Sequence, residues 1–200
     1  MRVLAACEHS GVVREAFAAL GHDAWSCDLL PSLQPGNHIQ GDALSVLRDG
    51  WDLLIAHPPC QYLSYAGMRH WDNPGRAEKR EAALCFFMQM INAPVPHICV
   101  ENPRGLPCQA YRQPDQIIHP YFFGDPALKR TCLWLKKLPL LWYWDEPGSM
   151  FEVTAAPLPK PVSVEAGGKR RHWTDSVRDP QVRSRTFPSV AAAMAAQWGT

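Results

Sequence analysis

Four short apolar runs, each ending abruptly at polar or reactive residues, constrain the fold of this chain more than any other feature. The runs cover residues 2–7, 24–27, 51–56 and 97–100. Short apolar runs bounded in this way are typical of buried strands. Helical patterns separate them, such as the one from Arg76 to Ile91. We therefore predict an α/β fold, an open and mostly parallel sheet with right-handed crossovers.

The pattern changes after Pro103. Residues 116–120 and 129–135 are expected to form two strands around the turn Gly124-Asp125-Pro126, which predicts an antiparallel C-terminal hairpin. A closing helix is expected over residues 190–198.

The stretch between hairpin and closing helix, residues 139–185, is rich in proline and basic side chains. It contains six prolines, and six basic residues lie between Lys169 and Arg185. We expect this insertion to be irregular. The whole chain, residues 1–200, is long enough for one well-packed domain and too short for two ordinary ones.

The composition, 46% hydrophobic and 20% charged, is that of a globular protein and excludes a disordered or fibrous chain. No apolar stretch approaches 18 residues, so no membrane partner is expected. The apolar run before Glu8 is about five residues long, which favours a buried strand over a signal peptide. Seven scattered cysteines without a CxxC pair argue against disulfides and a zinc site, and favour a cytoplasmic location. A formal charge of +1 does not by itself indicate a nucleic-acid-binding protein.

Polar side chains follow each predicted parallel strand, where ligands bind in such sheets. The groups are Glu8-His9-Ser10-Gly11, Asp28, Pro58-Pro59-Cys60 and Glu101-Asn102. Because four strands each end in such a group, the sequence predicts a ligand site at the carboxyl ends of the parallel strands.

Cys60 is the most informative of these residues, because a cysteine after Pro-Pro at a strand end is held in a rigid loop. It is either a buried, inert thiol or a nucleophile, and a nucleophile needs exposure and a positive neighbour. His57 and Cys60 could form half of a zinc site, but a second pair is missing. The nucleobase-deaminase signature requires a second cysteine where this chain has Leu63.

Three further residues fit a site of this kind. Glu101 is either a solvated loop carboxylate or a group that donates a proton to a ring nitrogen. Asp28 follows the second strand, where an acid commonly binds ribose hydroxyls. Gly11 permits a tight strand-to-helix turn.

Taken together, these motifs resemble those of the DNA cytosine-5 methyltransferase family. Pro58-Pro59-Cys60-Gln61 with Ser64 is similar to its PCQ nucleophile motif, and Glu101-Asn102 to its ENV motif. Further similarities lie in Ala6–Gly11, Cys27-Asp28, Gly41-Asp42, the hairpin residues 124–135 and the closing segment 187–197. The resemblance covers roughly residues 1–138 and 184–198 and implies a Rossmann-like, S-adenosylmethionine-dependent methyltransferase fold.

The resemblance also implies a reaction and a set of site residues. Cys60 would attack carbon 6 of cytosine in DNA, Glu101 would engage ring nitrogen 3 and the exocyclic amine, and Lys129 would hold the ring carbonyl oxygen. S-adenosylmethionine would be bound by Cys7, Glu8, His9, Ser10, Gly11, Val12, Val13, Asp28, Asp42 and Pro58. Substrate or DNA contacts are expected from Gln61, Ser64, Asn102, Arg130, Arg170 and Arg171. No metal is expected.

The chain departs from the family pattern at several points. Only Gly11 remains of the glycine-rich first motif, and Lys129 stands where the hairpin motif has its first arginine. Residues 139–185 replace the family's large target-recognition domain, as in trimmed proteins carried by phages and prophages. Because little surface remains to present side chains to base edges, we expect methylation with little sequence specificity.

Other functions remain open on the sequence alone. The same chemistry on RNA or a free pyrimidine nucleotide would suit a short chain, although the basic segment from Lys169 to Arg185 argues against it. An amino-methyltransferase would carry Asp or Asn at position 57 and an aromatic residue at position 60, where this chain has His57 and Cys60. A catalytically silent, cofactor-binding regulatory module would not need Cys60 and Glu101.

Overall fold

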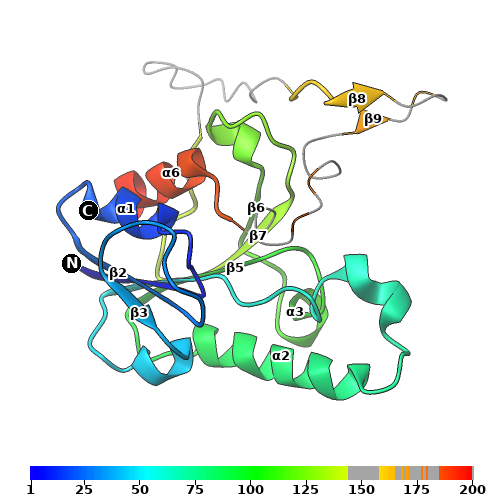
Figure 1. Ribbon diagram of the computed structural model, residues 1–200, viewed down its shortest axis with the longest axis horizontal. Helices are drawn as coiled ribbons and strands as arrows, with labels where there is room; N and C mark the ends of the chain where they lie inside the picture. Colours follow the sequence, from blue (N-terminus) through cyan, green and yellow to red (C-terminus); the bar gives the residue numbers. More distant parts are fainter. Residues whose placement is uncertain are drawn as a thin grey trace.

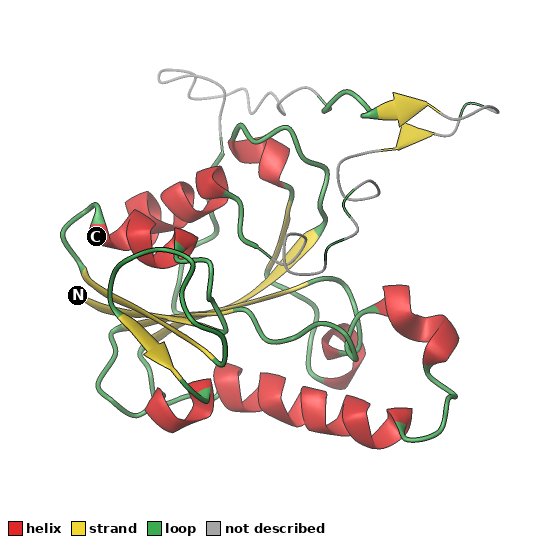
Figure 2. Ribbon diagram, viewed as in Figure 1, coloured by secondary structure: helices red, strands yellow, loops and turns green. Residues whose placement is uncertain are grey.

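The fold is known from a computed structural model. It describes residues 1–143, 158–164, 168, 170–171, 177, 179 and 185–199. Figures 1 and 2 show a central twisted sheet with helices on both of its faces.

The central sheet has seven strands in the order β3-β2-β1-β4-β5-β7-β6. β1 to β5 are parallel, whereas β7 is antiparallel to both β5 and β6. The strands are β1 (Arg2–Ala6), β2 (Asp23–Asp28), β3 (His38–Gln40), β4 (Leu53–Ala56), β5 (His97–Asn102), β6 (Gln116–Ile118) and β7 (Thr131–Lys136). This mostly parallel sheet with an antiparallel C-terminal hairpin confirms the predicted α/β, Rossmann-like methyltransferase fold.

Helices cover the two faces of the sheet. They are α1 (Val12–Ala18), η1 (Ala43–Val46), η2 (Tyr65–His70), α2 (Arg76–Ile91), α3 (Pro107–Ala110), η3 (Pro120–Phe123) and α6 (Pro188–Trp198). α1 and α6 pack on one face and α2 lies across the other (Figure 1). The bounds of α2 are those predicted from its helical pattern.

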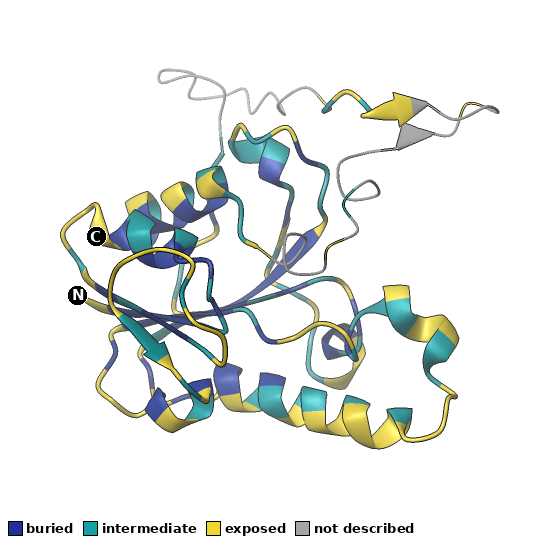
Figure 3. Cartoon of the chain, in the orientation of Figure 1, coloured by how far each residue is buried: buried dark blue, intermediate teal, exposed yellow. Residues whose placement is uncertain are grey.

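Alternating strand residues separate the core into two layers. Val3 and Ala5 pack toward α1 and α6, whereas Leu4 and Ala6 face Phe87 of α2. Because the strands are buried on both faces, they carry continuous apolar runs rather than an alternating pattern. Figure 3 shows this burial along the middle of the sheet.

The short edge strand β3 lies where the sequence predicts a polar loop, over residues 38–40. β3 pairs with β2 in the register Ser26↔His38, and the Ser26 hydroxyl lies 2.9 Å from His38 Nδ1. The three residues of β3 are half-buried or exposed, and they are too few to form an apolar run that would predict a strand. Pairing with β2, a tertiary contact, makes them a strand.

A buried arginine secures the segment that links β2 and β3. The Arg14 side chain is 1% exposed and donates to the hydroxyls of Ser26 (3.0 Å) and Ser32 (3.1 Å). It also donates to the carbonyl oxygens of Gln34 (3.1 Å) and Pro35 (2.7 Å). These bonds satisfy a buried guanidinium and hold the segment against α1.

Part of the 139–185 insertion is described. Its strands β8 (Ser163–Val164) and β9 (Arg170–Arg171) form an antiparallel pair, so the segment is not irregular throughout. In the described part of the chain, no helix is long and apolar enough to span a membrane.

Candidate active site

The parallel strands bring their polar ends to one edge of the sheet, as predicted. β4 lies between β1 and β5, in the registers Ala6↔Ala56 and Ala56↔Val100. The residues that follow these positions are therefore neighbours in space. The loop with Cys60 and the end of β5 with Glu101 meet at this edge.

The loop after β4 holds Cys60 in an exposed, constrained position. The Cys60 carbonyl oxygen accepts bonds from the amides of Leu63 (3.1 Å) and Ser64 (2.9 Å). Asn102, which is 1% exposed, donates from Nδ2 to the Pro58 carbonyl oxygen at 2.7 Å. Thus Asn102, predicted as a substrate contact, fastens the cysteine loop to β5.

A second fastening lies just beyond Cys60. The Leu106 amide donates to the Leu63 carbonyl oxygen at 2.8 Å, and Ser64 forms a bridge with Gly105. A Cβ at Gly105 would lie 2.0 Å from the Leu63 carbonyl oxygen. Only glycine allows this approach, because the backbone atoms of Leu63 and Ser64 leave no room for a side chain.

Burial distinguishes Cys60 from other cysteines near the strand ends. Burial raises the pKa of Cys7 to about 12, assisted by the nearby charges of Asp28 and Asp42. Burial likewise raises the pKa of Cys132 to about 12. These thiols remain protonated at neutral pH and are poor nucleophiles, whereas Cys60 has the exposure that a nucleophile needs.

Glu101 is a nearly buried carboxylate at the end of β5. Its side chain is 11% exposed, and its Oε2 lies 3.0 Å from His57 Nδ1. Burial alone would raise the pKa of Glu101, but the positive charge of Lys129 and the hydrogen bond from His57 outweigh it, so that the pKa is lowered. Glu101 is therefore ionised at neutral pH.

Lys129 lies just before β7, beside β5. Its Nζ is 5.9 Å from the centre of the Phe187 ring and donates to the Arg185 carbonyl oxygen at 3.5 Å. The segment that leads into α6 thus helps to place the Lys129 ammonium within electrostatic reach of Glu101. Two residues expected in the site, Glu101 and Lys129, thus interact electrostatically, whereas their catalytic roles remain a prediction.

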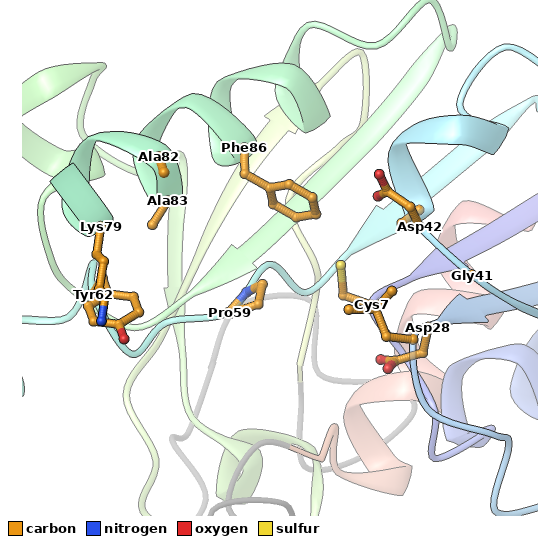
Figure 4. Close-up of a pocket in the computed structure, with 12 residues that line it drawn as sticks. Cys7, Asp28, Gly41, Asp42, Pro59, Tyr62, Lys79, Ala82, Ala83 and Phe86 are labelled. Atoms are coloured by element: carbon orange, nitrogen blue, oxygen red, sulfur yellow. The ribbon is translucent and has the colours of Figure 1, made fainter.

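A cavity of about 400 Å³ opens beside the cysteine loop (Figure 4). This volume lies within the range of small-molecule sites. Asp28 and Asp42 lie at one end of the cavity, whereas Tyr62 and Lys79 lie at the other. The wall is formed by Cys7, Asp28, Leu29, Gly41, Asp42, Ala43, Pro59, Tyr62, Lys79, Ala82, Ala83 and Phe86.

One face of α2 supplies a wall that the sequence analysis missed. Lys79, Ala82, Ala83 and Phe86 all line the cavity. Their i, i+3, i+4, i+7 spacing places them on one side of the helix. This spacing was visible in the sequence, but it is the usual pattern of a helix that packs on a core, so it did not indicate a ligand.

Only some of the expected cofactor-binding residues line the cavity. Cys7, Asp28 and Asp42 line the cavity, and Pro59 lies in its wall, whereas the expected Pro58 is buried. Glu8, Ser10 and Val12 form a local cluster in which Glu8 Oε1 accepts from the Ser10 hydroxyl and from the Val12 amide (3.0 Å). The remaining three, His9, Gly11 and Val13, lie in or next to the same turn.

Gly11 has a left-handed backbone (φ 78°) and caps α1. Its role in the tight turn is the one predicted for it. Val13 is fully buried in the core, and the carbonyl oxygen of His9 accepts from the Leu33 amide at 2.8 Å.

The expected substrate contacts also differ in their surroundings. Gln61 and Arg130 are exposed near Cys60 and β7, respectively. Ser64 caps η2 by accepting from the Ala66 amide at 3.1 Å. The backbones of Arg170 and Arg171 form β9, and their side chains lie outside what is described.

No group of three or more His, Cys, Asp or Glu side chains suited to a metal ion occurs among the described residues. No family model matches the chain. No curated protein matches it either.

Among solved structures, the chain is similar to an E. coli protein named as a DNA modification methyltransferase encoded within a prophage. The two share 15% sequence identity with a TM-score of 0.44. The match covers 68% of this chain and 46% of the other, so the chain spans less than half of that protein's length.

Proposed function

We propose that this protein transfers a methyl group from S-adenosylmethionine to carbon 5 of cytosine in DNA through a covalent Cys60 adduct. The proposal rests on the loop of the exposed Cys60, which Asn102 fastens to the end of β5, where the nearly buried, ionised Glu101 lies within electrostatic reach of Lys129. A thiolate, a carboxyl group and a cation are the groups needed to add a nucleophile to a pyrimidine ring and stabilise the charge that develops.

The cavity next to Cys60 fits the adenosine part of S-adenosylmethionine. Its two carboxylates each use one oxygen locally, Asp28 toward the Leu30 amide (2.9 Å) and Asp42 toward the Leu44 amide (3.0 Å). The second oxygen of each can accept from hydroxyl or amino groups. Phe86 and Pro59 offer apolar faces to a planar base. When bound, the cofactor supplies an electrophilic methyl group.

The chain's own residues would activate the cytosine. Cys60 forms a bond from Sγ to carbon 6, and the displaced ring electrons make carbon 5 nucleophilic. Glu101 takes up a proton when the base binds and gives it to ring nitrogen 3, and it accepts a bond from the exocyclic amine. Lys129 donates to the ring carbonyl oxygen. After carbon 5 is methylated, it loses its proton to solvent and the bond from carbon 6 to Sγ breaks, which releases the thiolate. Ring nitrogen 3 returns its proton to Glu101, and the neutral aromatic ring is restored.

A direct test is nucleoside mass spectrometry of DNA treated with the purified chain and S-adenosylmethionine. We expect 5-methylcytosine, produced at sites with little sequence context. N4-methylcytosine or N6-methyladenine would indicate amino-methyl transfer and would contradict the role given to Cys60. Modification of RNA or free nucleotides, but not of DNA, would overturn the substrate assignment.

Replacing Asp28 with alanine is expected to weaken cofactor binding more than the chemical step. A ribose contact is made equally in the ground and transition states, so its loss changes affinity. A bond to a charged group contributes about 1.5–3 kcal/mol, which corresponds to roughly a 10–150-fold loss of affinity. Calorimetry with S-adenosylmethionine measures this, with the exposed Asp49→Ala as the control. Unchanged affinity of Asp28→Ala would remove Asp28 from the site.

A further inference from the structure

His57 is a buried residue that the proposed reaction does not use. It directly follows β4, and its amide donates to the Ala6 carbonyl oxygen at 2.9 Å. Its side chain is 8% exposed, and Nδ1 lies 3.0 Å from Glu101 Oε2. Nε2 is buried and has no hydrogen-bond partner among the described residues. Within the described part of the chain, the imidazole therefore has one polar contact, which is with Glu101.

The state of Glu101 determines the direction of that contact. An ionised carboxylate can only accept hydrogen bonds, so His57 Nδ1 carries the proton and donates. Burying a nitrogen without a hydrogen-bond partner costs folding free energy, so a hydrocarbon side chain of similar size would be more stable here. The contribution of the His57 ring beyond packing is therefore its one hydrogen bond, which goes to a single oxygen of Glu101.

We propose that His57 is a positioning residue that occupies Oε2 of Glu101 and thereby leaves Oε1 as the oxygen that carries and delivers the proton to the base. An oxygen that already accepts an N–H bond is the less basic of the two. When Glu101 takes up a proton from solvent, the proton is directed to Oε1. After Oε1 gives the proton to the ring nitrogen, His57 and Lys129 stabilise the restored carboxylate. The kinetic part of this inference rests on the proposed function, whereas the hydrogen bond itself does not.

The surroundings of Glu101 allow the effect of His57 to be isolated. Among the described residues, the charged and titratable groups that act with Glu101 include His57 after β4, Lys129 before β7, and the thiols of Cys99 in β5 and Cys132 in β7. Burial raises the pKa of both cysteines, so they stay neutral and do not contribute a charge. Lys129 is unchanged in a His57 variant.

The test compares His57→Leu, which fills the space without a donor, with His57→Asn, whose amide can reach the place of Nδ1. We expect His57→Leu to lower kcat by roughly 10–100-fold with little change in the KM for either substrate, because a misplaced catalytic group slows the chemical step. His57→Asn should restore most of the rate. His97→Leu, at the start of β5, is the matched control and should keep the wild-type rate.

The pH dependence separates positioning from a purely structural role. His57 stabilises the charged form of Glu101, so its removal raises the carboxyl pKa. The acidic limb of the kcat/KM profile should therefore move to higher pH in His57→Leu and less so in His57→Asn. A reduced rate with an unmoved limb would show that His57 serves only the packing of the core, and would overturn the proposal.

A measurement that needs no activity distinguishes this inference from the proposed function. In protein labelled with ¹³C at glutamate carboxyl groups, the Glu101 signal, assigned with Glu101→Gln, should titrate at higher pH in His57→Leu than in the wild type. Thermal unfolding checks that each variant is folded. If the midpoint does not move in folded His57→Leu, the inference is overturned even if the wild type methylates DNA. If the midpoint moves but the wild type modifies no cytosine, the hydrogen bond stands, and both the proposed function and the delivery of a proton to the base are overturned.

Discussion

Replacing Cys60 with alanine is expected to abolish methyl transfer, with a loss of about 10⁴-fold or more. Removal of a covalent nucleophile costs several orders of magnitude because the substrate can no longer be activated. The fold should survive, since Cys60 is exposed and alanine keeps the backbone carbonyl oxygen that accepts from Leu63 and Ser64. Radiolabelled methyl transfer to DNA measures the effect.

The matched control is Cys85→Ala, since Cys85 is the other exposed cysteine. It should retain wild-type activity. An oligonucleotide with 5-fluorocytosine should form a stable covalent complex with the wild type and with Cys85→Ala, but not with Cys60→Ala. A covalent complex with Cys60→Ala would assign the nucleophile to another residue.

Glu101→Gln is expected to slow the chemical step by roughly 10²–10⁴-fold, the usual contribution of a general acid. Glutamine keeps the shape and can still bond to His57, but it cannot deliver a proton. The affinity for S-adenosylmethionine should change little, because Glu101 is absent from the cavity wall formed by Cys7, Asp28 and their neighbours. Single-turnover kinetics and calorimetry measure the two quantities separately.

Glu78→Gln provides the control for Glu101→Gln. Glu78 is an exposed carboxylate in the first turn of α2. Its replacement should leave both the single-turnover rate and the cofactor affinity unchanged. An unchanged single-turnover rate in Glu101→Gln would reduce Glu101 to a structural residue and remove the proton-transfer step from the mechanism.

The mostly parallel sheet and the edge at which its strands end in polar residues could be predicted from the sequence. Buried parallel strands carry continuous apolar runs, and their ends are marked where polar residues begin, as at Asp28 and Glu101. α2 was predicted with its observed bounds because its pattern extends over 16 residues. In each case the signal lies in consecutive residues, so it can be found without knowledge of the neighbours.

The sequence could not reveal contacts between residues that are far apart in the chain. β3 becomes a strand by pairing with β2, and the burial of Arg14 depends on carbonyl oxygens some twenty residues away. The residues of α2 that line the cavity have the same spacing as residues that pack a helix on a core, so the sequence alone did not identify them as part of a ligand site.

The clearest example is His57. In the sequence it is the residue before two prolines, and its spacing to Cys60 suggested only an incomplete metal site. The parallel pairing of β4 with β5 places it against Glu101, 44 positions further along the chain. The types of the reactive residues and their order along the chain were thus determined by the sequence itself. Which of them are buried, ionised and in contact was decided only by the tertiary structure, because burial and electrostatics depend on every element that surrounds a side chain.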